Sequence, residues 1–158
     1  MIKTAVLIIS DSCAEGKRQD LSGQVIVDIL PGDKFQICQR KIVPDNQHSI
    51  VEELKKYSDE EKVDIVLTAG GTGLGPRDVT PEATASVCEK IVPGLGEILR
   101  AQSFKKTRNA VLSRGMAGIR NETLIINLPG SPKAVSECLE IIMDVLPHAM
   151  EMMHGGGH

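Results

Sequence analysis

The segment from Gly70 to Gly75 reads Gly-Gly-Thr-Gly-Leu-Gly and has four glycines in six positions. Glycine lets backbone N–H groups come close to an anion and adopts positive φ without steric cost. Between a strand and a helix, such a loop can hold phosphate groups, although it can also be a plain tight connection. It has neither the Gly-Lys-Ser/Thr of a Walker A loop nor the G-x-G-x-x-G dinucleotide pattern. The segment therefore predicts a phosphate site without P-loop or Rossmann chemistry.

Asp78 follows this loop closely, within the run Pro-Arg-Asp-Val-Thr-Pro. A carboxylate beside bound phosphates is unfavourable unless a cation lies between them. Mg²⁺ resolves this conflict, because it binds one or two carboxylates together with substrate phosphates. Asp45, at the end of another predicted strand, is the natural second carboxylate. The alternatives are a helix-capping role for Asp78 and a turn role for Asp45. Arg77 would either neutralise phosphate or pair with Asp78.

Residues 98–121 contain no acid, although the protein as a whole has a net charge of −3. Their basic residues are Arg100, Lys105, Lys106, Arg108, Arg114 and Arg120. One interpretation is a solvated basic face, and the other is a local anion site on an otherwise acidic protein. Within this stretch, Ser113-Arg114-Gly115 offers a hydroxyl, a guanidinium and a glycine backbone. Those groups suit a terminal phosphate, although an exposed loop would have the same composition.

Stretches rich in apolar and β-branched residues alternate along the chain with helix-like stretches. Strands are expected over 4–10, 35–43, 63–69 and 123–128. Helices are expected over 21–30, 46–57, 79–91 and 95–104, separated from one another by turns and by the breaker Pro93-Gly94. Asn46 and Thr80 are the expected N-caps of two of these helices. A long amphipathic helix follows Pro132, and Pro147 is expected to kink it.

This order predicts an α/β fold: a single domain built as a three-layer sandwich with a mainly parallel central sheet. In such sheets, ligands bind beyond the carboxyl ends of the strands. Four predicted strand ends carry polar or glycine-rich residues, and together they would form one cleft. These ends are Ser10-Asp11-Ser12, Pro44-Asp45, Gly70-Gly71-Thr72-Gly73 and Pro129-Gly130-Ser131.

The composition argues against several classes of partner. A net charge of −3 and a pI of about 5.8 give no general attraction to nucleic acid or to an anionic membrane. The chain has no Trp, and its aromatic residues are Tyr57, Phe35 and Phe104. So few rings make base stacking or an aromatic cage an unfavourable mode of recognition. Any nucleotide should be held by backbone, hydroxyl and aliphatic groups.

The cysteines and the N-terminus point to the cytoplasm. The four cysteines form no C-x-x-C pair, so we interpret them as reduced and mostly buried thiols, with Cys13 the more exposed. The N-terminus runs directly into a predicted strand without a signal-peptide pattern, and no apolar run reaches membrane-spanning length. A cytoplasmic protein is therefore expected.

Taken together, these motifs resemble the molybdenum-cofactor biosynthesis (MogA/MoaB) family over nearly the whole chain. The glycine loop with the following Pro76-Arg77-Asp78-Val79-Thr80-Pro81 run is most similar to the family signature. Ser10-Asp11, Val43-Pro44-Asp45, Leu112-Ser113-Arg114 and Asn127-Leu128-Pro129-Gly130-Ser131-Pro132 match in the family's order. Some MoaB-type members depart from the Arg-Asp-Val-Thr-Pro run or from the Asn-Leu-Pro-Gly-x-Pro turn, whereas this chain keeps both. The resemblance therefore favours the family's molybdopterin adenylyltransferases over a MoaB-like binding or scaffold protein.

The resemblance implies the reaction and the site. ATP and molybdopterin would be the substrates, Mg²⁺ the cofactor, and adenylyl-molybdopterin and pyrophosphate the products. Asp45 and Asp78 would be both catalytic and metal-binding. The nucleotide would lie on Ser10, Asp11, Gly70, Gly71, Thr72 and Gly73, and molybdopterin on Ser113, Arg114, Pro129, Gly130 and Ser131.

The resemblance also implies the domain extent and the assembly. Residues 1–153 would form the molybdopterin-binding domain, and residues 154–158 a disordered tail. The protein would assemble as a homotrimer and meet the molybdate-inserting enzyme of the same pathway. Neither nucleic acid nor a membrane is expected as a partner.

Overall fold

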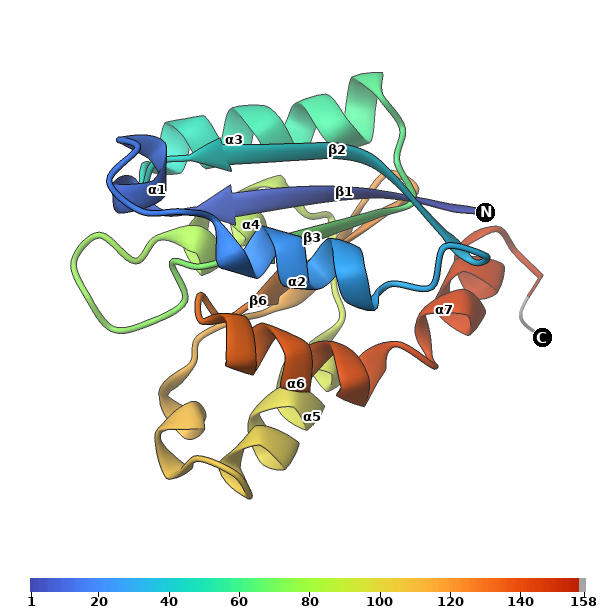
Figure 1. Cartoon of the computed structure of the whole chain (residues 1–158). Coiled ribbons are helices and arrows are strands. Elements are labelled where there is room, and N and C mark those ends of the chain that lie inside the picture. The colour runs from blue at the N-terminus through green and yellow to red at the C-terminus, as the bar shows by residue number, and fades with distance from the viewer. Residues whose placement is uncertain (157–158) are drawn as a thin grey trace.

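A computed structural model describes residues 1–156 and shows one mixed β-sheet covered by helices (Figure 1). The strand order within this part of the chain is β2-β1-β3-β6-β5-β4. Strands β2, β1, β3 and β6 are parallel, and β5 runs antiparallel to both of its neighbours. The bounds are β1 Ile2–Ile9, β2 Phe35–Val43, β3 Ile65–Ala69, β4 Lys90–Ile91, β5 Ala117–Arg120 and β6 Thr123–Leu128. The carboxyl ends of the four parallel strands therefore meet at one edge of the sheet.

The helices form a layer on each face of the sheet (Figure 1). Helices α3 and α4 cover one face, and α2, α5 and α6 cover the other. Their bounds are α1 Asp11–Ala14, α2 Leu21–Ile29, α3 Gln47–Lys55, α4 Thr80–Val87, α5 Pro93–Phe104, α6 Pro132–Ile142 and α7 Leu146–Met153. A π-helical turn, η1, spans Lys56–Glu60, and a 3₁₀ turn, η2, spans Arg108–Leu112.

The central strand β1 shows why three layers form. Its side chains alternate between two buried clusters, because successive residues of a strand point to opposite faces. Leu7 is fully buried among residues of α3 and α4, whereas Val6 is fully buried among residues of α2 and α6. Burial of one such side chain stabilises the fold by about 1.5–3 kcal/mol. The predicted fold class is confirmed.

Between α4 and β6 the predicted elements were partly wrong. The helix expected over 79–91 ends at Val87, because Cys88 turns extended and the next residues pair with β5. Strand β5 itself was not predicted, since its four residues include only two apolar side chains. Helix α5 begins at Pro93, whereas the expected helix began at residue 95. Proline is favoured in the first turn of a helix, so Pro93 starts α5 and does not only separate two helices.

Three smaller expectations also change. The long C-terminal helix is two helices, α6 and α7, and Pro147 lies in the first turn of α7 and does not kink a continuous helix. Residues 11–14 form the short helix α1 within the expected loop. Cys38 is exposed on the edge strand β2, and among the four free thiols only Cys138 is buried.

The expected tail at 154–158 is described only in part. His154 and Gly156 close the end of α7 through backbone hydrogen bonds to Met150 and Glu151. Residues 157–158 lie outside the described part of the chain. Among the described helices, none is long and apolar enough to cross a membrane.

Candidate active site

The carboxyl edge of the parallel strands encloses a cavity of about 380 Å³. Its wall includes predicted site residues from all four strand ends. These are Ser10, Asp45, Gly70, Gly71, Asp78, Gly130 and Ser131. Thr72 and Gly73 belong to the same loop without lining this cavity, and Asp11 lies against Asp45 through hydrogen bonds. The structure therefore brings most of the predicted nucleotide and metal residues together.

The glycine loop is held in a conformation that only glycine accepts easily. Gly70 and Gly71 have φ values of 105° and 69°. A Cβ atom on Gly71 would lie 2.2 Å from Oγ1 of Thr80, so the space for a side chain is already filled. Thr80 anchors this turn: its hydroxyl donates to the carbonyl of Gly70 at 2.9 Å, and its N–H donates to that of Gly71 at 3.1 Å. Thr80 thus fixes the loop and is not the N-cap of α4, which is Val79.

Asp45 is clamped to Asp11 by two reciprocal hydrogen bonds. The N–H of Asp11 donates to Oδ2 of Asp45 at 2.9 Å, and the N–H of Asp45 donates to Oδ1 of Asp11 at 3.0 Å. Arg77 completes the arrangement, since its Nε and Nη2 donate to the two oxygens of Asp11 at 2.5 and 2.9 Å. Arg77 therefore pairs with Asp11 and not with Asp78. This chain of contacts ties the ends of β1 and β2 to the loop that follows β3.

The two proposed metal carboxylates each keep one oxygen uncommitted. Oδ2 of Asp78 accepts a hydrogen bond from the N–H of Gly75 at 2.9 Å, and Oδ2 of Asp45 is used by Asp11. Within residues 1–156, Oδ1 of neither aspartate accepts a hydrogen bond. That part of the chain also holds no cluster of three or more His, Cys, Asp or Glu side chains suited to a metal. With two carboxylates as protein ligands, the pair would fit Mg²⁺ only in a form that completes its shell with phosphate and water oxygens.

The electrostatics of the cavity agree with this fit. Burial raises the pKa of Asp45, and the negative charges of Asp11 and Asp78 raise it further. The guanidinium of Arg77 acts in the opposite direction on Asp11 and lowers the pKa of that carboxyl. An unneutralised carboxylate in this cavity is thus disfavoured, and a bound cation would remove the penalty.

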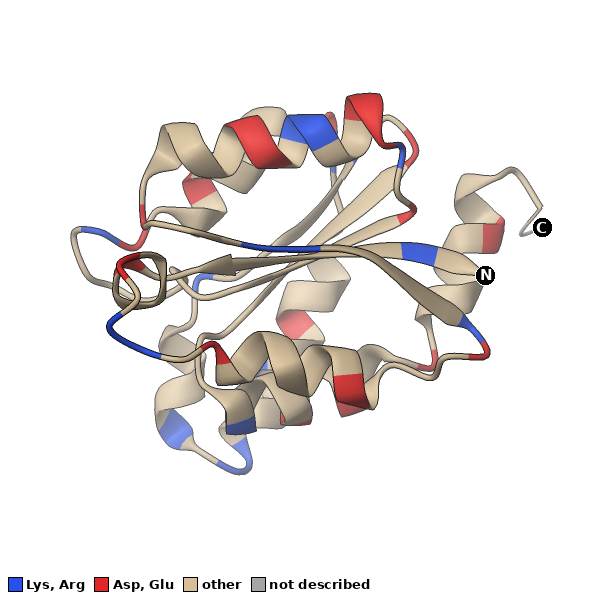
Figure 2. Ribbon diagram, turned by 45° about the horizontal axis from the view of Figure 1, so that its top comes forward, with Lys and Arg blue, Asp and Glu red and all other residues tan. Residues whose placement is uncertain are grey.

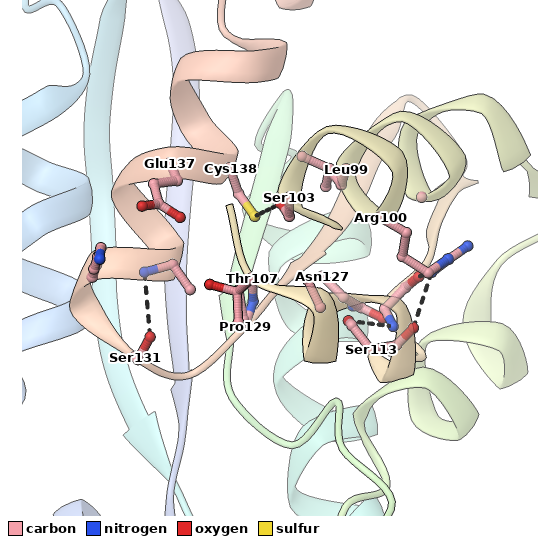
Figure 3. Close-up of a pocket in the computed structure, with 15 residues that line it drawn as sticks. Leu99, Arg100, Ser103, Thr107, Ser113, Asn127, Pro129, Ser131, Glu137 and Cys138 are labelled. Carbon is pink, nitrogen blue, oxygen red and sulfur yellow. Dashed lines mark hydrogen bonds between the residues drawn. The ribbon is translucent and has the colours of Figure 1, made fainter. Parts of the chain in front are cut away.

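A second cavity, of about 220 Å³, lies between α5, η2 and the start of α6 (Figure 3). Ser113, Pro129 and Ser131, three of the predicted molybdopterin residues, line it. Ser131 also lines the first cavity, so the two spaces adjoin at the N-terminus of α6. Its hydroxyl oxygen accepts a hydrogen bond from the N–H of Ala134 and thereby caps that helix. The second cavity is the more apolar of the two, with Leu99, Ala110, Ala134 and Cys138 among its lining residues.

Comparison with known proteins decides the family. The family model described as "Probable molybdopterin binding domain" matches residues 5–148. The chain belongs to this family.

Individual relatives support the assignment. The molybdopterin adenylyltransferase of Helicobacter pylori (strain J99) is 44% identical over 156 residues, which are 98% of this chain and 89% of that protein. The molybdenum cofactor synthesis protein cinnamon of Drosophila melanogaster is 46% identical over 96% of this chain, which spans only 26% of cinnamon. The molybdopterin biosynthesis enzyme MoaB of Thermus thermophilus is 45% identical in sequence to this chain. Its crystal structure matches this structure with a TM-score of 0.93 over 98% of each chain.

Within this family member, Arg114 lies apart from the second cavity. Its Nε donates to the carbonyl of Gly73 and its Nη2 to that of Asp78, both at 2.8 Å. Its Nη1 pairs with the carboxylate of Glu82, and its N–H donates to the carbonyl of Thr72. Arg114, which follows η2, thus connects the glycine loop to Glu82 of α4, and a direct role on the acceptor phosphate stays a prediction. The sequence pattern identified the residue but could not identify these partners.

The basic stretch is partly structural. Arg100 donates to the carbonyls of Ser113 and Gly115, and Arg120 pairs with Asp59 at the opposite edge of the sheet. The remaining basic residues lie at the end of α5 and in η2, where Figure 2 shows blue segments gathered at one lower corner. A solvated basic corner, together with two structural arginines, accounts for most of this stretch.

Proposed function

We propose that this protein is a molybdopterin adenylyltransferase, which transfers AMP from ATP to the terminal phosphate of molybdopterin and releases pyrophosphate. The observation that carries the proposal is the pair of adjoining cavities. One has two aspartates with uncommitted oxygens beside a glycine loop, and the other is more apolar and reaches the first at Ser131. That arrangement suits two different substrates whose phosphates meet.

The reaction needs positioning more than it needs a base. An oxygen of the terminal phosphate of molybdopterin forms a bond to the α-phosphorus of ATP, and the bond from that phosphorus to the bridging oxygen breaks. Pyrophosphate leaves with the electron pair. The attacking phosphate is already ionised near neutral pH, so the protein must neutralise charge and hold the reacting groups in line.

Each predicted residue has a role in that task. Asp45 and Asp78 would hold Mg²⁺, which when bound neutralises charge on the triphosphate. The glycine loop from Gly70 to Gly73 would present N–H groups to the nucleotide phosphates, since anions are favoured by such backbone groups before a helix. Ser10 and Asp11 would complete the nucleotide side.

The acceptor side would be formed by the second cavity. Ser113 and the Pro129-Gly130-Ser131 turn would surround molybdopterin, with the acceptor phosphate near the N-terminus of α6. Arg114 would keep the adjacent glycine loop in place and contribute positive charge. Ser131, which belongs to both cavities, would lie where the two substrates meet.

The adenine base is proposed to lie against aliphatic and backbone surfaces. Phe35 and Tyr57 are buried in separate clusters on opposite faces of the sheet, with 4% and 1% of their surface exposed. Phe104 has the guanidinium of Arg108 over its ring, 4.7 Å from the centroid. None of these rings lines the cavity that contains Asp45 and Asp78.

A second candidate is a MoaB-like protein that binds molybdopterin without strong catalytic activity. It is favoured by the solved MoaB structure, whose identity to this chain is as high as that of the named adenylyltransferase. A homotrimeric assembly, a cytoplasmic location and contact with a molybdate-inserting enzyme are further proposals that rest on the family resemblance.

Pyrophosphate release separates the two candidates. Purified protein would be incubated with ATP, MgCl₂ and molybdopterin, and pyrophosphate measured over time. We expect release that requires all three components. Binding of molybdopterin without pyrophosphate, under conditions in which the Helicobacter pylori enzyme is active, would support the MoaB-like candidate instead.

A further inference from the structure

One acidic side chain lies in the second cavity. Glu137 is on α6, and Figure 3 shows it on the same side of the cavity as Ser131, with Ser103 and Thr107 from the α5–η2 segment around the space. It is the one acid among the described residues that line this cavity. Much of the surrounding wall is aliphatic, including Leu99 and Pro129.

The carboxylate of Glu137 has no partner within the protein. Across residues 1–156 it forms neither a hydrogen bond nor an ion pair, although it is only partly exposed. Lys133 lies one helical turn earlier and lines the same cavity, yet it is not paired with Glu137. A carboxylate without protein donors keeps both of its oxygens free to accept hydrogen bonds from a ligand. The cavity therefore has an acceptor for a ligand that brings donors into it.

We propose that Glu137 recognises the 2-amino-4-oxopyrimidine edge of a pterin, and that this side chain selects the pterin end of molybdopterin. That edge presents the 2-amino group and the ring N3–H side by side. A carboxylate accepts hydrogen bonds from two parallel N–H groups, and such charge-assisted pairs are among the stronger hydrogen bonds. The proposal rests on the proposed function, because it names how that second cavity reads its substrate.

The helix geometry gives the bound pterin a direction. Glu137 lies six positions after Ser131, which corresponds to about 9 Å along the axis of α6. The phosphate and the 2-amino edge are at opposite ends of molybdopterin. With the edge at Glu137, the phosphate points toward the N-terminus of α6, where N–H groups favour an anion. That end is also where Ser131 joins the cavity of Asp45 and Asp78.

Substrate kinetics would test the proposal with Glu137→Ala and Glu137→Gln. Glu140→Gln is the matched control, because Glu140 is exposed on the same helix and does not line the cavity. For Glu137→Ala, KM for molybdopterin should rise about 10- to 100-fold, the range expected for losing hydrogen bonds to a charged group. Its kcat and its KM for ATP should stay within about threefold, and Glu140→Gln should match the wild type. An unchanged KM for molybdopterin in both Glu137 variants would overturn the proposal. If the Ala variant does not fold, the near-isosteric Gln variant decides the question by the same measurement.

A binding comparison works without turnover. Pterin and lumazine differ at position 2, where lumazine has an oxo group in place of the amino group, and both can be titrated by fluorescence. Wild-type protein should bind pterin at least about tenfold more tightly than lumazine, and Glu137→Ala should lose that preference. Equal affinities in the wild type would overturn the proposal. A protein that keeps the preference but releases no pyrophosphate would contradict the proposed function while leaving the recognition by Glu137 intact.

Discussion

The two edges of the sheet contain the same kind of ion pair in different surroundings. At the carboxyl edge, the guanidinium of Arg77 donates hydrogen bonds to both carboxylate oxygens of Asp11. At the amino edge, the guanidinium of Arg120 donates hydrogen bonds to both carboxylate oxygens of Asp59. In each case the guanidinium lowers the pKa of the aspartate. An arginine–aspartate pair alone therefore does not distinguish a reactive edge from a structural one.

The two ion pairs differ in the further hydrogen-bond partner of each aspartate. Asp59 accepts a further hydrogen bond from the side chain of Asn121, which lies in the turn between β5 and β6. Asp11 instead holds Asp45, whose remaining oxygen is uncommitted and whose pKa is raised by burial. The carboxyl edge also has the two positive-φ glycines Gly70 and Gly71. At the carboxyl edge the ion pair therefore holds a second carboxylate, which we propose to be catalytic, whereas at the amino edge it holds a neutral side chain.

The largest expected effect is that of Asp78→Ala. Loss of one of two carboxylates for Mg²⁺ should lower pyrophosphate release at least about 100-fold, the scale of removing a group that stabilises developing charge. The melting temperature should be nearly unchanged, because Asp78 is partly exposed and its carboxylate accepts, among the described residues, a single hydrogen bond, from the N–H of Gly75. Asp59→Ala, at the amino edge, should retain wild-type turnover. Normal turnover by Asp78→Ala would show that the metal assignment is wrong.

Arg77→Ala should lower kcat about 10- to 100-fold, because Asp45 is then held by an unsupported Asp11. Arg77→Lys should restore little, since lysine cannot supply the two parallel N–H groups. The matched control is Arg120→Ala, which removes the corresponding pair at the other edge. Steady-state kinetics on the three variants would check this, and equal losses for Arg77→Ala and Arg120→Ala would remove the distinction between the edges.

Gly71→Ala tests the loop through stability. Alanine would have to adopt a φ of 69° and place its Cβ 2.2 Å from Oγ1 of Thr80. The free energy of unfolding, measured with urea, should fall by about 1–3 kcal/mol. Gly94→Ala is the control, because a Cβ there meets no atom within 4 Å and helix α5 accepts alanine. Equal stability of the two variants would argue that the loop is not constrained.

Asp59→Asn should have the smallest effect. The folded-state pKa of Asp59 is lowered by Arg120, so the pair stabilises the fold above the unfolded aspartate pKa of about 3.9. That contribution is lost as the pH falls through the lowered pKa of the folded state. Because both side chains are partly exposed, the loss at neutral pH should be at most about 1 kcal/mol. Urea unfolding at several pH values should show a difference that disappears in acid, and a constant difference would exclude an electrostatic cause.

The main elements were predictable because they depend on local pattern. The β-branched runs of β1, β3 and β6 mark buried strands, and Asn46 caps α3 as its residue type suggests. The same pattern failed where tertiary pairing decided the structure. Residues 90–91 pair with β5 although they continue a helical pattern, and β5 has too few apolar residues to be recognised alone.

The candidate site was predictable in its types of residue and less so in its contacts. Glycine, aspartate and serine at strand ends indicate a ligand edge, and the structure brings them to one cavity. The partner of Arg77 could not be predicted, because Asp11 is 66 residues away in the chain. Glu137 gave no signal, since an acid on an amphipathic helix is ordinarily solvated.

Transfer of the α-phosphate of ATP is the decisive measurement for the carboxyl edge. Wild-type protein, Asp45→Asn and Asp59→Asn would each be incubated with MgCl₂, molybdopterin and ATP carrying a radioactive α-phosphate. The label in adenylyl-molybdopterin would then be measured over time. We expect transfer by the wild type and by Asp59→Asn at similar rates, with almost none by Asp45→Asn. Transfer by Asp45→Asn at the wild-type rate, or an equal loss in both variants, would contradict the assignment of catalysis to this edge.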